Sequence, residues 1–214
     1  MNHEKVETNV GLMAVLIAVV VAVGGLAEIV PLMHQAEAIE PLPGVVPYPP
    51  LQLAGRDIYV REGCYNCHSQ MVRTLRFETE RYGHYSLAGE SVYDRPFQWG
   101  SKRTGPDLAR LGGKYSDDWH AAHLRSPRAL VPESIMPPYA FLDRPLDADS
   151  MKARLAAQRA LGTPYTDEMV ANAAADLEAQ AKPDAEGAGF ARNGSMAFLA
   201  LPTAAVSVLI RSGV

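Results

Sequence analysis

The chain has 214 residues and a formal net charge of −4. This length allows one domain of ordinary size together with extra segments. The slightly acidic balance gives no sign of the basic surface that nucleic-acid binding requires, so we expect no nucleic-acid partner. The chain has only two cysteines, three positions apart, and a disulfide between them would close too small a loop to stabilise a fold.

The N-terminal region contains a long apolar run. Residues Val10 to Ala27 carry no charge, and only Glu28 interrupts the pattern up to Met33. At about 1.5 Å per residue a helix of this length crosses the ~30 Å hydrocarbon layer, so residues 1–34 are expected to form a transmembrane anchor in membrane lipid. A cleavable secretory signal is the alternative, but the run is longer than such signals use and lacks a positive flank. Glu28 is either an interfacial group or a functional one.

Two segments of unusual composition border the expected domain. Residues 35–52 are rich in proline, which disfavours a helix and predicts a semi-rigid spacer. A helical pattern starts at Leu53, and we expect a folded domain over residues 53–187. Residues 188–214 form an atypical apolar tail, whose stretch Met196–Ile210 is too short for a clear membrane crossing and contains Pro202.

The two cysteines belong to the run Cys64-Tyr65-Asn66-Cys67-His68. A zinc site would need further ligands at matched spacing, and a redox dithiol would need a βαβ context. Neither is evident. The third chemistry is the C-x-x-C-H attachment of one covalent haem c, in which two thiols bond the vinyl groups and the following histidine binds iron. The sequence favours haem attachment by Cys64 and Cys67 with His68 as proximal ligand.

A c-type haem needs a second axial ligand, commonly a methionine in a downstream loop. Met136 stands in "VPESIMPPYAF", where prolines restrict the backbone. The other methionines fall in the anchor, in helical stretches, in the tail, or too close to the proximal histidine. We therefore predict Met136 as the distal ligand, with a methionine that merely fills a core gap as the alternative.

The proximal histidine also needs an acceptor for its other ring nitrogen. Gly105-Pro106 predicts a tight turn, and the Pro106 carbonyl is the candidate acceptor. Four further side chains are candidate partners of the haem propionates or ordinary surface residues: Trp99, Lys102, Arg103 and Tyr115.

Taken together, "CYNCH", "RTGPDLARLGGKYSDDWHAAHLRSPRALVPESIMPPYAFL" and "LGTPYTDE" closely resemble the monohaem subunit of cbb3-type cytochrome c oxidases, the FixO or CcoO family. The likeness runs from about residue 5 to residue 185. It implies a mainly α fold, in which one N-terminal transmembrane helix precedes a class I cytochrome c domain with a long insertion. It also implies His68 and Met136 as axial ligands of the haem iron.

The resemblance further implies partners and a place in the cell. A catalytic subunit with haem b and a haem–copper centre would reduce oxygen to water, and a dihaem cytochrome c subunit would complete the complex. This chain would then transfer electrons without itself being the catalytic subunit, in the bacterial inner membrane with its haem domain in the periplasm. A free-standing membrane-anchored cytochrome c shuttle is the alternative.

Residues 69–104 form a longer segment than a compact cytochrome c uses at this place. Loops of this length are usually functional, and the mixture of Arg, Tyr, Trp and Glu suits a polar interface with a partner subunit. A solvated insertion is the alternative.

Overall fold

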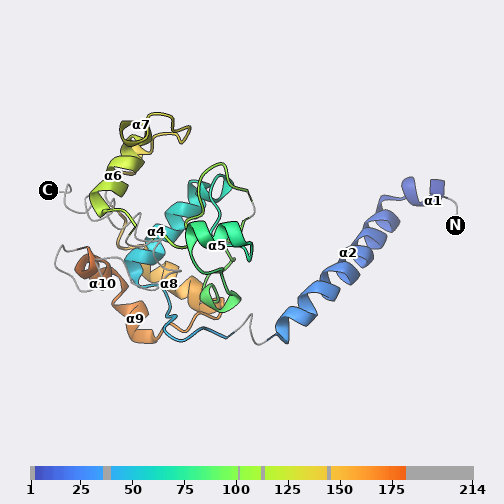
Figure 1. Ribbon diagram of the computed structural model, residues 1–214. Helices are drawn as coiled ribbons and strands as arrows, with labels where there is room; N and C mark the ends of the chain where they lie inside the picture. Colours follow the sequence, from blue (N-terminus) through green and yellow to red (C-terminus); the bar gives the residue numbers. More distant parts are fainter. Residues whose placement is uncertain (1–2, 36–39, 101, 112–113, 144–145, 182–214) are drawn as a thin grey trace. The chain divides into compact units, whose positions relative to one another are not determined.

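The computed structural model describes residues 3–35, 40–100, 102–111, 114–143 and 146–181 (Figure 1). The chain divides into two compact units, Met1–Glu40 and Pro41–Val214. The described residues form helices, turns and loops and contain no strand, which confirms the mainly helical fold class. The expected tail, residues 188–214, lies outside the described residues.

The described residues of the first unit form two helices, α1 (His3–Glu7) and α2 (Val10–Met33). Asn9 caps α2, because its side-chain oxygen accepts a hydrogen bond from the backbone N–H of Leu12 at 3.0 Å. The 24 residues of α2 span roughly 36 Å at the usual helical rise. Within the described part of the chain this is the one helix long and apolar enough to cross a membrane, as the sequence predicted.

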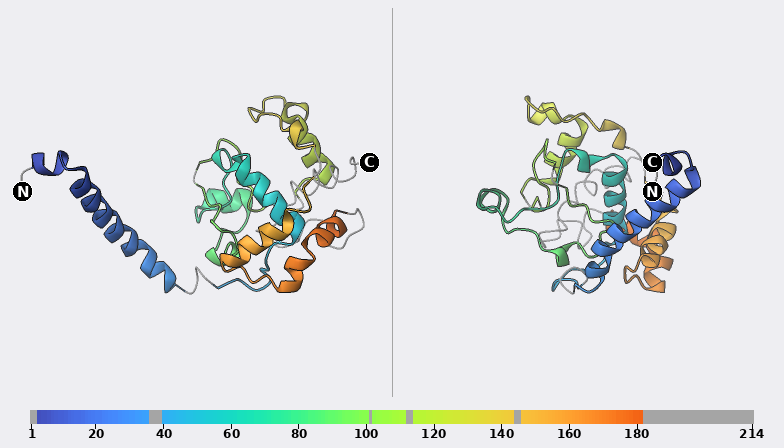
Figure 2. Two further views of the ribbon diagram at one scale, coloured as in Figure 1. Left: turned by 180° about the vertical axis from the view of Figure 1, so that it is seen from behind. Right: turned by 90° about the vertical axis from the view of Figure 1, so that its right-hand side faces the viewer.

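The second unit is built around three packed helices, α4 (Pro50–Arg61), α8 (Met151–Ala160) and α10 (Ala173–Gln180). Figures 1 and 2 show α4 and α8 near the middle of this unit and α10 at its side. Helix α9 (Asp167–Ala171) contacts α8. The facing side chains of these helices make one apolar core, which includes Leu53, Ile58, Leu155 and Leu177. Burial of such side chains is the main force that holds the unit together.

Helix α4 begins at Pro50, three residues before the start that the sequence pattern suggested. Proline is well tolerated at the first helical positions, because its missing N–H would have no partner there and its φ is already helical. The residues before α4 are also part of the core: Tyr48 is buried, and its carbonyl accepts a hydrogen bond from the Tyr165 hydroxyl at 2.7 Å. The proline-rich segment therefore ends inside the domain.

Helix α10 closes the domain by packing on α4. Ala173 and Leu177 are fully buried, and the side-chain oxygen of Gln180 accepts a hydrogen bond from the Leu51 backbone N–H at 3.0 Å. A terminal helix packed on the helix that precedes the C-x-x-C-H motif is therefore present, and it lies before the apolar tail.

The segment 69–104 folds inward and carries two short helices, α5 (Arg76–Tyr82) and η2 (Ala88–Glu90). Three ion pairs connect it to the rest of the domain: Arg103–Asp107, Arg110–Glu90 and Arg56–Asp94. A further pair, Arg103–Glu78, joins two parts of the segment itself. The Arg110 pair is bidentate, with distances of 2.8 and 2.7 Å. Because these ion pairs join the insertion to other segments of the domain, the insertion is part of the fold rather than a solvated loop.

Glu78 is completely buried between Arg103 and Arg73. Burial alone would raise the pKa of Glu78, but hydrogen bonds from Arg103 and Arg73 outweigh it and lower this pKa from 4.5 to about 2. A carboxyl whose pKa is depressed in the folded state stabilises the protein above the unfolded pKa, and that stability is lost as the pH falls through the folded pKa. The contribution of Glu78 is therefore complete above pH 4.5 and disappears towards pH 2.

We expect Glu78→Gln to lower the free energy of unfolding by roughly 3–5 kcal/mol at pH 7, because it removes a buried carboxylate that pairs with both Arg103 and Arg73. The variant should also lose the part of the acid sensitivity that the wild type shows between pH 4.5 and 2. Denaturant unfolding of the full-length chain, followed by tryptophan fluorescence at several pH values, measures both effects. Glu80→Gln is the control, since the Arg76–Glu80 pair is exposed and should contribute little; equal losses in both variants would contradict the assignment.

Candidate functional site

The C-x-x-C-H motif lies on a tight turn that directly follows α4. Gly63 adopts a left-handed conformation with φ 69°, and a side chain there would meet the Asn66 amide, so glycine ends the helix. The next turn, η1 (Cys64–Asn66), continues with two hydrogen bonds to the Cys64 carbonyl, from the backbone N–H groups of Cys67 at 3.1 Å and of His68 at 3.0 Å. This helical spacing brings both cysteines and the histidine to one side of the turn.

The two cysteines form no disulfide with each other and differ in their surroundings. Cys64 is half-buried against the apolar core, whereas Cys67 is exposed. Burial raises the pKa of the Cys64 thiol to about 11, which keeps it protonated at neutral pH. Among the described residues no group of three or more His, Cys, Asp or Glu side chains could hold a metal ion.

The imidazole of His68 is held by Pro106 and Gly105. His68 Nδ1 lies 2.8 Å from the Pro106 carbonyl oxygen. Because a carbonyl only accepts hydrogen bonds, Nδ1 carries the hydrogen, and the lone pair of the neutral ring is on Nε2. Burial lowers the pKa of His68, which favours this neutral form. A Cβ atom at Gly105 would lie 2.3 Å from His68 Cε1, so only glycine leaves room for the ring.

The backbone around His68 is fixed on several sides. The Gly105 N–H donates to the Cys67 carbonyl at 2.8 Å, and the Leu108 N–H donates to the Ser69 carbonyl at 2.9 Å. The Tyr59 hydroxyl of α4 donates to the His68 carbonyl at 3.3 Å. The sequence pattern pointed to Pro106 as the acceptor but gave no sign of the close contact of Gly105 or of the role of Tyr59, since both depend on tertiary packing.

Met136 lies on a loop between α7 (Pro127–Leu130) and η3 (Ala140–Leu142). It is half-buried, and its backbone N–H donates to Ser134 Oγ at 3.2 Å. Arg128 Nε donates to the Ser134 carbonyl at 3.0 Å, and the Tyr139 N–H donates to the Leu124 carbonyl at 2.7 Å. A shallow pocket on this loop is lined by Ser126, Pro127, Arg128, Ile135, Met136, Pro137 and Pro138.

Tyr139, at the end of the Met136 loop, packs against the same apolar core as Cys64. Burial is the main cause that raises the pKa of Tyr139. Helix α6 (Asp117–Arg125) precedes α7 and carries His123, whose pKa is lowered mainly by burial.

The four candidate propionate partners have different surroundings. The guanidinium of Arg103 is turned into the domain, towards Glu78 and Asp107. The Trp99 indole N–H donates to Ser91 Oγ at 3.1 Å. The Tyr115 ring stacks on Trp119 with centroids 4.2 Å apart, and Lys102 is exposed. Their role towards propionates stays a prediction, and the contacts of Arg103 indicate a different one.

Gly105→Ala should displace the His68 ring, because the new methyl group would overlap three ring atoms. We expect the variant to lose the hydrogen bond to Pro106 and most of its covalently bound haem, measured by haem staining of the purified chain on a denaturing gel. Gly100→Ala is the matched control, since a Cβ at Gly100 would meet only the Tyr65 carbonyl at an ordinary 3.9 Å. Normal haem staining in Gly105→Ala would show that the ring is not held as described.

The donor groups of the site fit a c-type haem. Two thiols and a neutral imidazole share one turn, and the imidazole has its Nδ1 hydrogen engaged. A thioether stands on a proline-restricted loop, and Tyr139 at the end of that loop packs against the same core as Cys64.

Comparison with known protein families gives a match over most of the chain. The family described as cytochrome c oxidase, mono-heme subunit/FixO, matches residues 3–197. The curated protein sequences contain no significant match. The matched range includes α2, the C-x-x-C-H turn, the inserted segment and the Met136 loop. The chain therefore belongs to the family of mono-haem subunits of cytochrome c oxidase.

Proposed function

We propose that this chain carries one covalent haem c and transfers electrons through it to the catalytic subunit of a cbb3-type oxidase. The observation that carries the proposal is the neutral His68 imidazole, which donates from Nδ1 to Pro106 and keeps Nε2 for a metal. The chain belongs to the family of mono-haem subunits, so the metal that Nε2 would bind is the iron of a haem.

Each residue of the site has a distinct part in this proposal. Cys64 and Cys67 form the thioether bonds, His68 is the proximal ligand, and Met136 is the distal ligand. Pro106 orients His68, and Gly105 makes room for it. The bound haem supplies reversible one-electron chemistry, while the chain determines its position, its solvent exposure and its reduction potential.

Membership of the same family and helix α2 support the following proposed setting. The haem domain lies in the periplasm, where covalent haem attachment takes place in bacteria, and α2 spans the inner membrane once. The partners are the catalytic subunit with haem b and a haem–copper centre, and a dihaem cytochrome c. The exposed apolar side chains Leu75, Phe77 and Phe97 of the inserted segment suit contact with one of these subunits.

Purification in mild detergent tests the proposal directly. We expect the full-length chain to co-elute with a haem–copper subunit and to stain for covalent haem, whereas the Cys64→Ala, Cys67→Ala double variant should lose the stain. A stable lone cytochrome would instead support the free-standing shuttle. A wild-type chain without covalent haem would contradict the proposal altogether.

The identity of the distal ligand can be tested separately. Met136→His should keep the haem bound but lower its reduction potential, because an imidazole stabilises ferric iron more than a thioether does. A spectroelectrochemical titration of the purified complex at the c-type absorption band measures the shift. An unchanged potential would show that another residue is the distal ligand.

A further inference from the structure

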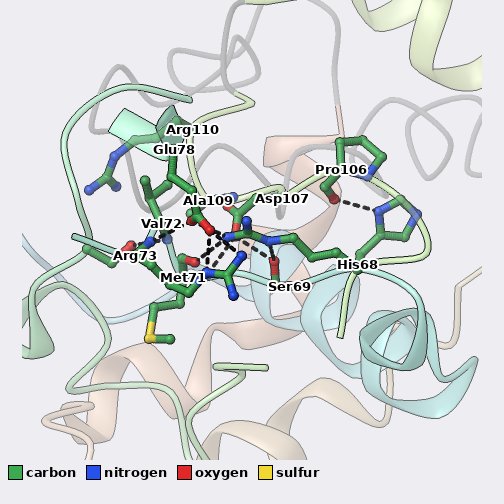
Figure 3. Close-up of polar contacts among 12 residues, drawn as sticks. His68, Ser69, Met71, Val72, Arg73, Glu78, Pro106, Asp107, Ala109 and Arg110 are labelled. Atoms are coloured by element: carbon green, nitrogen blue, oxygen red, sulfur yellow. Dashed lines mark hydrogen bonds and ion pairs between the residues drawn. The ribbon is translucent and has the colours of Figure 1, made fainter. Parts of the chain in front are cut away.

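Asp107 follows directly after Pro106, is almost completely buried and binds none of the proposed haem ligands. Its Oδ2 atom accepts hydrogen bonds from Ser69 Oγ at 2.7 Å, from the Met71 N–H at 3.0 Å and from Arg103 at 3.1 Å. Its Oδ1 atom accepts from the Ala109 N–H at 2.8 Å. Figure 3 shows this carboxylate joining two stretches of chain, residues 68–71 and 106–109.

These two stretches carry the two partners of the His68–Pro106 hydrogen bond. Ser69 directly follows His68, and Asp107 directly follows Pro106. The hydrogen bond between Ser69 and Asp107 therefore lies next to the hydrogen bond between His68 and Pro106. A change in the carboxylate's contacts therefore moves the Pro106 carbonyl relative to the imidazole. A buried carboxylate is costly unless its oxygen atoms accept hydrogen bonds, so the positions of its donors are restricted.

Arg103 holds the carboxylate in place. Its guanidinium donates to Ser69 Oγ at 2.5 Å, to the Met71 carbonyl at 2.8 Å and to Glu78 Oε2 at 2.7 Å, besides Asp107. The planar fork of an arginine reaches several acceptors at once, which the single ammonium group of a lysine does not. Arg103 thus links the stretch around Ser69 to Asp107 and to the fully buried Glu78.

We propose that Asp107, Ser69 and Arg103 are positioning residues that set the strength of the His68–Pro106 hydrogen bond and, through it, the reduction potential of the haem. The inference rests on the proposed function, since it takes His68 as an axial ligand. A hydrogen bond from Nδ1–H makes the imidazole a more basic ligand, which favours the oxidised iron. Loosening the cluster weakens this bond and raises the potential.

Two variants test the proposal without changing the net charge. Ser69→Ala removes one hydrogen bond to Asp107, and Arg103→Lys keeps the charge but loses the fork. Both should shift the midpoint potential of the c-type haem upwards in the purified complex, with normal haem content. Asp107→Asn should shift it further in the same direction, because it also removes a negative charge.

Arg110→Lys is the matched control. Arg110 is as buried as Arg103, at 14% side-chain exposure. Its replacement by lysine also removes a guanidinium group, which here donates to both carboxylate oxygens of Glu90. The described contacts of Arg110 do not include Ser69 or Asp107. Its potential should equal that of the wild type.

The outcomes separate this inference from the proposed function. Unchanged potentials in Ser69→Ala and Arg103→Lys would overturn the inference alone, even if the melting temperature fell, because the cluster would then be merely structural. A shift confined to Asp107→Asn would also overturn it, since charge alone would explain the effect. Absence of a c-type haem from the wild-type complex would overturn the proposed function together with the inference.

Discussion

The hydrogen bond between the Nδ1–H of His68 and the Pro106 carbonyl is the contact on which the site depends. Its partners stand 38 positions apart in the chain, so the fold must bring two loops together and keep them there. Two backbone hydrogen bonds next to this contact and the missing side chain at Gly105 make the approach possible. The orientation of the ring therefore depends on the space that Gly105 leaves as much as on the hydrogen bond.

The inserted segment, residues 69–104, connects these two loops and is packed against the same domain. Glu90 and Asp94 pair with arginines of other segments, and Glu78 pairs with Arg103 of the insertion itself, which explains how a stretch so rich in charge can lie against the domain. The sequence alone could not distinguish this arrangement from a charged outer surface, because composition does not say which arginine meets which carboxylate. Pairing over such sequence separations is decided by the tertiary fold.

Local patterns account for what the sequence predicted well. The long apolar run, the C-x-x-C-H spacing and the Gly105-Pro106 turn each act over a few residues, and each corresponds to a feature of the structure. The start of α4 was misjudged because a proline-rich stretch resembles a spacer, although Pro50 fits the first helical positions. Asp107 escaped notice for another reason: an aspartate after a turn is ordinarily exposed, and only the fold shows that this one is buried.

The two proposed axial ligands are held by different physical means. His68 is fixed by a buried polar cluster in which each hydrogen bond constrains several others, so substitutions there should combine non-additively. Met136 stands on a loop whose backbone is restricted by Pro137 and Pro138 and by a few local hydrogen bonds. Restriction by proline lowers the entropy of the unfolded chain, and it does not couple the loop to the rest of the domain. In the proposed arrangement, a change in the inserted segment would reach the proximal ligand through this cluster, whereas the hydrogen bonds described for the Met136 loop join it to Arg128, Ser134 and Leu124. If a partner subunit contacts the insertion, its effect on the reduction potential should reach the site through Arg103 and Asp107.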